Sequence, residues 1–247
     1  MAVKGSSTAA RVLVVFEAVA AHQPIGVAEL ARTLGMDKSA VQRALVTLAG
    51  QGWIQASEDQ VTRWQITPRI LRIADSSSAK YDLRQTIQLT LEDLANKTGE
   101  TAIFNEPDGS QLVVAQVAES RQSLRMVPRI GAVVPARDSA TGRILLPFLG
   151  EQRQAELLGG PPDADFRALM DESRARGFAA SGDVDAPTMT IAAPVFAAGG
   201  RAIGAVAITG PAERLPADAC VRQAELVCLA AQAISAAAGR GPAAELR

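Results

Sequence analysis

One face of a helix predicted over residues 38–49 carries side chains that can read base edges. Its outward positions hold Lys38, Ser39, Ala40, Gln42 and Arg43. Arg43 can donate two hydrogen bonds to guanine, and Gln42 can bridge adenine. Lys38 and Ser39 stand at the helix start and suit phosphate contacts. Because an α-helix fits the major groove with its first residues at the base edges, this face is typical of a DNA-recognition helix.

The segment before this helix predicts the rest of a helix-turn-helix. A first helix begins at the N-cap candidates of residues 6–8 and is broken at 23–26, and a short second helix over 27–34 is apolar on one face. Gly35 and Met36 make a tight turn, after which Asp37 can cap the third helix. An ordinary solvated face is the simpler interpretation of any single polar residue here. That alternative does not account for the turn glycine, the short second helix and the polar third helix together.

A hairpin follows the third helix. Strands are predicted over 53–56 and 63–66 around the polar tip 57–60, and Thr62 and Arg63 beside this tip could reach the DNA backbone or minor groove. Trp53 and Trp64 are expected to pack beneath the hairpin rather than stack on bases. The order helix, helix, turn, helix, hairpin is that of a winged helix-turn-helix.

Composition limits the class of protein further. The 247 residues are 48% hydrophobic and 21% charged with a net charge of −1, so the chain can form packed cores and is not a polybasic nucleic-acid coat. One His and two Cys are too few for a disulfide framework or a Cys/His zinc site. Without a catalytic motif, a phosphate loop or paired metal ligands, we expect no catalytic residue, metal or cofactor. No apolar run approaches membrane-spanning length, and a cytoplasmic protein is expected.

A serine cluster near residues 75–79 marks a boundary, and basic residues slightly outnumber acidic ones only before it. Beyond it, helices are predicted over 68–78, 81–97, 139–149, 151–158, 165–176 and 216–238. Strands are predicted over 101–105, 111–117, 124–127, 189–196 and 202–209. An antiparallel sheet with helices packed on it gives an α+β fold. A small-molecule pocket could form between the curved sheet and its loops.

Cys220 and Cys228 are expected to pack as small apolar side chains of the last helix, with a redox switch as the alternative.

The sequence resembles the IclR family of bacterial transcriptional regulators. The similar segments, in the family's order, are residues 27–43, 45–54, 98–102, 130–143, 176–178, 191–196 and 208–211. The resemblance implies a winged helix-turn-helix over 1–67, a linker helix over 68–79, and a GAF-like effector-binding and oligomerisation domain over 80–247. It also implies a homodimer, often paired into a homotetramer, on palindromic double-stranded promoter DNA.

The resemblance further implies a site for a small-molecule effector, in this family often an organic or aromatic acid. Carried over position by position, the pocket falls near Met126, Ala140, Thr141, Asp183, Thr190 and Thr209. Thr190 replaces a frequent Cys and Ala207 a frequent Ser, so the identity of the effector does not transfer directly.

The leading hypothesis is a transcription factor that responds to a metabolite and is not an enzyme. Two alternatives stay open: a constitutive DNA-binding dimer without an effector, and a metabolite-processing enzyme with an accessory DNA-binding domain. The effector, the operator, the sign of regulation and the choice between dimer and tetramer are left open by the sequence.

Overall fold

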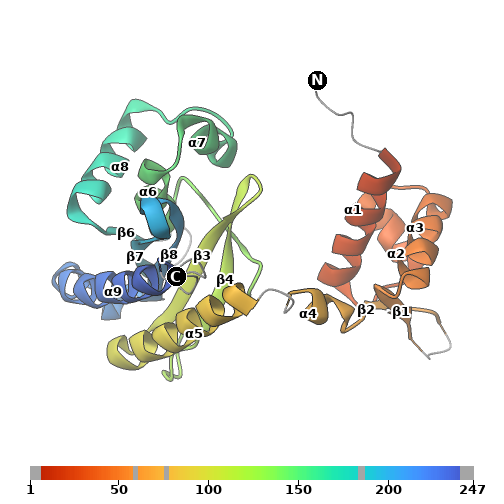
Figure 1. The fold of residues 1–247 in the computed structure, drawn as a ribbon, viewed down its shortest axis with the longest axis horizontal. Coiled ribbons are helices and arrows are strands. Elements are labelled where there is room, and N and C mark those ends of the chain that lie inside the picture. Colours follow the sequence, from red (N-terminus) through yellow and green to blue (C-terminus); the bar gives the residue numbers. More distant parts are fainter. Residues whose placement is uncertain (1–6, 58–60, 75–77, 183–186, 240–247) are drawn as a thin grey trace, which may run out of the picture. The chain divides into compact units, whose positions relative to one another are not determined.

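The computed structural model describes residues 7–57, 61–74, 78–182 and 187–239. The chain divides into two compact units, Met1–Ser78 and Ala79–Arg247 (Figure 1). Among the described residues, no helix combines the length and the hydropathy needed to cross a bilayer.

The first of these units, Met1–Ser78, is called the front unit and is a three-helix bundle with a hairpin. Its elements are α1 (Ser7–His22), α2 (Val27–Leu34), α3 (Lys38–Gly50), β1 (Ile54–Ala56), β2 (Trp64–Ile66) and α4 (Arg69–Ala74). The apolar positions at helical spacing meet in one core, where Val15, Val19, Leu30, Val41 and Leu45 are fully buried. The helix-helix-turn-helix-hairpin order predicted from the sequence is therefore confirmed.

The turn between α2 and α3 explains how the third helix is presented. Gly35 ends α2 in the left-handed conformation with φ of 59°, which a side chain would disfavour. Asp37 occupies the N-cap position of α3, but its side chain accepts no capping hydrogen bond. Asp37 therefore stands at the predicted position, immediately before α3, but the prediction that its side chain caps the helix is wrong.

The hairpin pairs β1 with β2 antiparallel, and Ile54 stands opposite Ile66. The Trp53 ring meets the Phe16 ring edge to face at a centroid separation of 5.6 Å, and β2 extends its pairing to Ile25 through Trp64. Both tryptophans pack against the core of the front unit, as expected.

The second unit, Ala79–Arg247, is called the rear unit and is an α+β sheet domain. Its helices are α5 (Ser78–Thr98), α6 (Ala140–Leu145), α7 (Glu151–Leu158), α8 (Ala164–Arg176) and α9 (Ala217–Ala238). Its strands are β3 (Thr101–Asp108), β4 (Gln111–Ala118), β5 (Val133–Val134), β6 (Ala179–Gly182), β7 (Thr188–Phe196) and β8 (Ala202–Pro211). The strands form one antiparallel sheet in the order β5-β4-β3-β8-β7-β6.

Helices cover both faces of this sheet. The apolar sides of α5 and α9 pack on one face, around Phe104, Val206 and Ile208, while α6 packs on the other face against Ile103 and Ala207 (Figure 1). Successive residues of a strand point to opposite faces, so each strand contributes to both cores. The pairing of β3 with β4 changes register between Phe104 and Asn105.

Three features of the rear unit differ from the sequence prediction. Residues 124–127, predicted as a strand, have no regular secondary structure. Strands β5 and β6 were not predicted. The helix predicted over 139–149 ends as α6 at Leu145 and continues as a 3₁₀ helix over Leu146–Phe148, where Pro147 cannot donate the next backbone hydrogen bond.

Candidate functional site

The long polar side chains on the outward face of α3 make no hydrogen bond or ion pair within the described part of the chain. Lys38, Ser39, Gln42 and Arg43 are exposed and Ala40 is half-buried. The described residues give Lys38, Gln42 and Arg43 no side-chain hydrogen bond or ion pair. Val41, Ala44, Leu45 and Leu48 fill the opposite side of the helix and are buried. The packing therefore turns the donor groups away from the core.

Val46 extends this face and was missed at the sequence level. It lies one turn after Gln42 and Arg43, and 58% of its surface is exposed. The spacing of three and four residues from the polar pair was the available signal. An exposed valine in this place can meet the methyl group of a thymine.

The wing residues differ from one another in their surroundings. Thr62 is exposed. The guanidinium of Arg63 donates to the carbonyl of Pro24 at 3.1 Å and lies 3.9 Å from the Glu29 carboxylate, while its backbone N–H donates to Ser57 at 3.1 Å. Arg63 thus ties β2 to the start of α2.

A cavity of about 360 Å³ lies in the rear unit on the α6 face of the sheet. It is lined by Ile103, Asn105, Val114, Met126, Pro128, Ala132, Val133, Val134, Pro135, Asp138, Ser139, Thr141, Ser181, Gly182, Thr188, Thr190 and Thr209. Of the pocket residues predicted from the resemblance, Met126, Thr141, Thr190 and Thr209 come together here. Ala140 instead packs, fully buried, between α6 and the sheet. Asp183 lies outside the described residues.

Asn105 is the cavity residue that the sequence analysis missed. It is fully buried, and its Nδ2 donates to Thr141 Oγ1 at 2.7 Å. Its Oδ1 is buried and has no hydrogen-bond partner within the described structure. On the neighbouring strands the hydroxyls of Thr190 and Thr209 are 3.1 Å apart. The cavity therefore carries polar groups on β3 and α6 and again on β7 and β8.

Charge is scarce in the described lining of this cavity. Asp138 is its one ionisable side chain, and it is exposed. The described lining offers no Lys, Arg or His to a bound anion, so hydroxyl, amide and backbone groups must do the binding. Six lining residues are Ser or Thr.

Side-chain hydrogen bonds fix the loop that carries Met126. Thr101 Oγ1 donates to the Met126 carbonyl at 2.5 Å, and Ser120 Oγ donates to the Gly99 carbonyl at 2.5 Å. These bonds hold residues 120–126 in an irregular path, which is the physical reason why residues 124–127 do not form a strand.

An ion pair between Arg214 and the buried carboxylate of Glu100 also fixes the loop that carries Met126. Both carboxylate oxygens of Glu100, which is 3% exposed, accept hydrogen bonds from Arg214 at 2.6 and 2.7 Å. Arg214 also donates to the Leu124 carbonyl at 3.1 Å. The hydrogen-bonded Glu100 carboxylate raises the pKa of Arg214 above its usual value. Gly210 leaves the space for this pair, because a Cβ there would lie 2.1 Å from a Glu100 oxygen.

Gly142 brings α6 against the loop before it. A Cβ on Gly142 would lie 1.7 Å from the carbonyl oxygen of Ala136, so only glycine allows this approach. Ser139 caps α6 by accepting the Gly142 backbone N–H at 3.1 Å. This packing places Thr141 beside Asn105.

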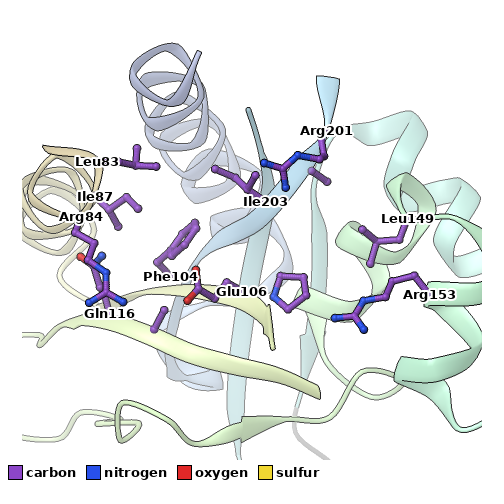
Figure 2. A pocket seen from close by; sticks show the side chains of 13 residues that line it. Leu83, Arg84, Ile87, Phe104, Glu106, Gln116, Leu149, Arg153, Arg201 and Ile203 are labelled. Atoms are coloured by element: carbon purple, nitrogen blue, oxygen red, sulfur yellow. The ribbon is translucent and has the colours of Figure 1, made fainter. Parts of the chain in front are cut away.

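A second hollow of about 590 Å³ lies on the opposite face of β3. Figure 2 shows Arg84, Arg153 and Arg201 around it, with Phe104 and Glu106 between them. Arg153 is paired with Glu156 at 3.0 Å. This hollow could not be predicted from the sequence, because folding brings its residues together from α5, from α7 and from strands β3, β4 and β8.

Models of two protein domains match the chain. Residues 8–58 match the IclR helix-turn-helix domain, and residues 76–236 match the C-terminal domain of the bacterial transcriptional regulator IclR. The glycerol operon regulatory protein of Streptomyces griseus is 29% identical over 206 residues, which cover 78% of this chain and 80% of that protein. The regulator KdgR of Escherichia coli is 24% identical over 245 residues, covering 94% of this chain and 93% of KdgR.

Solved structures share the fold. An IclR homologue from Microbacterium hydrocarbonoxydans, complexed with 4-hydroxybenzoate, has a TM-score of 0.78 and 21% identity, over 94% of this chain and 98% of that one. The Thermotoga maritima IclR has a TM-score of 0.70 and 21% identity, over 94% and 98% of the two chains. The winged helix-turn-helix, the sheet domain that follows it in the sequence and the two domain matches all indicate the same family. The chain belongs to the IclR family of bacterial transcriptional regulators.

Proposed function

We propose that this protein binds promoter DNA through α3 and that a small metabolite in the 360 Å³ cavity controls this binding. The observation that carries the proposal is the donor-rich face of α3, whose Lys38, Gln42 and Arg43 side chains are exposed and make no hydrogen bond or ion pair within the described residues. A face of this kind on the third helix of a winged helix-turn-helix is suited to the major groove.

The DNA contacts divide by chemistry. Arg43 reads guanine and Gln42 reads adenine, while Lys38, Ser39 and Thr62 bind phosphates. The smaller apolar positions, Ala40 and Val46, meet thymine methyl groups. Arg63 also contacts a phosphate, since its side chain is 46% exposed while it holds the Pro24 carbonyl.

The class of ligand that suits the cavity, and that the resemblance to the family implies, is an organic or aromatic acid. The apolar walls, including Met126, suit a hydrocarbon body, and the hydroxyls of Thr141, Thr190 and Thr209 suit its polar groups. The binding of 4-hydroxybenzoate by the homologue from Microbacterium hydrocarbonoxydans supports this class. Asp183 is proposed to complete the site, and Ala140 to support it by packing beneath Thr141. The described lining contains no Cys, His or Lys, which favours binding over conversion of the ligand.

The proposed assembly is a cytoplasmic homodimer, or a dimer of dimers, on palindromic DNA. We place the DNA-binding domain at 1–67, the linker helix at 68–79 and the effector and oligomerisation domain at 80–247. The effector acts by binding one arrangement of the domains more tightly than another, because a ligand shifts an equilibrium only through such a difference.

Gel-shift titration against the DNA upstream of the protein's own gene tests the proposal, over a range of salt concentrations. The wild type should bind this DNA at least a hundredfold more tightly than random DNA of the same length. Arg43→Ala should lower that preference by about 5- to 150-fold, which corresponds to about 1–3 kcal/mol. Arg201→Ala, which removes an exposed arginine from the rear unit, is the matched control and should leave it unchanged. Equal binding of upstream and random DNA by the wild type would overturn the proposal.

A further inference from the structure

The buried amide of Asn105 has an unmet hydrogen-bonding requirement. Its Nδ2 donates to Thr141, and its Oδ1 lacks a donor within the described structure, although the residue is fully buried. The opposite orientation of the amide would leave its N–H groups without an acceptor instead of one oxygen without a donor. Buried polar atoms without partners are destabilising, and a native protein keeps them where a ligand or water meets them.

The cavity supplies both halves of a hydroxyl site at this point. Thr141 Oγ1 already accepts from Asn105, so its own proton is available to donate. Asn105 Oδ1 is available to accept. One hydroxyl group can satisfy both atoms at once, since it donates one hydrogen bond and accepts others.

The other polar end of the cavity is rich in donors. Thr188, Thr190, Thr209 and Ser181 line it with hydroxyls, which can donate to a carboxylate. Asn105 pairs with Ala205 on β8, four residues before Thr209, so the backbones at the two ends lie about 13 Å apart along the strand, and the two side chains leave the sheet on the same face. A hydrogen bond of about 2.8 Å at each end leaves about 7 Å between the polar atoms of the ligand. One benzene ring with substituents at opposite positions has this length, and Ile103 provides an apolar floor between the ends.

We propose that Asn105 and Thr141 form a hydroxyl-recognition site, which makes this protein selective for hydroxylated monocarboxylic acids. The hydroxyl of the ligand donates to Asn105 Oδ1 and accepts from Thr141 Oγ1, and the carboxylate lies at the threonine end. This inference rests on the proposed effector-binding function and specifies the chemistry of that site.

Isothermal titration calorimetry of the full-length protein tests the selectivity. The probes are 4-hydroxybenzoate, benzoate and 4-methoxybenzoate, with 5-hydroxypentanoate and pentanoate as an aliphatic pair. Each hydroxylated acid should bind at least tenfold more tightly than its partner without the hydroxyl. The methoxy probe, which cannot donate, should bind as weakly as benzoate. Equal affinities within the pairs, or no binding of any probe, would overturn the inference.

Two variants separate recognition from a structural role. Asn105→Leu combined with Thr141→Val should abolish the hydroxyl preference without lowering the melting temperature, because both hydrogen-bonding partners are removed together. Thr190→Val should weaken hydroxylated and unsubstituted acids by the same factor. A lowered melting temperature of the double variant, or a retained preference, would overturn the inference.

Gel shifts without ligand distinguish a failure of the hydroxyl-recognition site from a failure of the proposed DNA-binding function. Specific DNA binding by a protein that shows no hydroxyl preference overturns only the hydroxyl site. Loss of specific DNA binding by the wild type overturns the proposed function itself.

Discussion

Arg214→Met removes the cation from the buried ion pair beneath the cavity loop. Glu100, which is 3% exposed in the wild type, loses two hydrogen bonds, and the Leu124 carbonyl loses its donor. Leaving a buried charge without its partner costs about 3–5 kcal/mol. Because the Arg214 side chain is 31% exposed, water can reach the vacated space, and we expect the lower end, about 3 kcal/mol. For a domain of this size, that corresponds to a fall in melting temperature of about 6–12 °C.

Urea and thermal unfolding of the rear unit, followed by circular dichroism, measure this loss. The matched control is Lys97→Met, which breaks an exposed pair with Asp93 at 2.6 Å and should cost less than about 0.5 kcal/mol. Adding Glu100→Gln to Arg214→Met should recover at least half of the lost stability, since a neutral amide no longer requires a cation.

Two results would refute this reasoning. The first is a loss for Arg214→Met no larger than that for the exposed control. The second is a double variant that is less stable than Arg214→Met alone. Either would mean that the pair does not hold the loop through its buried charge.

Three further predictions concern other parts of the chain. Arg43→Ala should cost about 1–3 kcal/mol of discrimination at one base pair, measured with operators that carry single substitutions, and equal losses on every sequence would contradict it. The backbone N–H of Phe166 and the guanidinium of Arg137 lower the pKa of Asp163. The stability that Asp163 contributes should therefore be complete above the usual aspartate pKa and lost as the pH falls through the lowered value, so the melting temperatures of wild type and Asp163→Ala should converge in acid. Burial raises the pKa of the Cys228 thiol. Its reaction with a thiol reagent at pH 8 should be slower than that of free cysteine, measured in a variant that lacks the other cysteine.

The front unit was predictable because local patterns determine its elements. The helix predicted over 27–34 matches α2 residue for residue, since Gly26 and Gly35 bound it and its apolar side is complete. The polar side of α3 followed from the same periodicity. The inward hydrogen bond of Arg63 did not, because Pro24 is 39 residues away in the sequence and only the folded hairpin brings the two together.

The rear unit was less predictable where tertiary contacts override local preference. Strand β5 has two residues and exists because Val113 and Leu112 pair with it. Residues 124–127, which were predicted as a strand, are held in an irregular path by Thr101 and Arg214. A resemblance identified part of the cavity wall. It could not reveal Asn105, whose importance arises from its burial beside Thr141.

The change of register between β3 and β4 has a consequence for how this protein can diversify. Phe104 pairs with Gln116 and Asn105 with Val114, so β4 carries one extra residue, Ala115, as a bulge. The bulge adds Ala115 to the wall of the 590 Å³ hollow, while Val114 lines the 360 Å³ cavity. Point substitutions on β4 can therefore alter one hollow while sparing the other, and deletion of Ala115 would remove the bulge while leaving Val114 opposite Asn105 and Gln116 opposite Phe104.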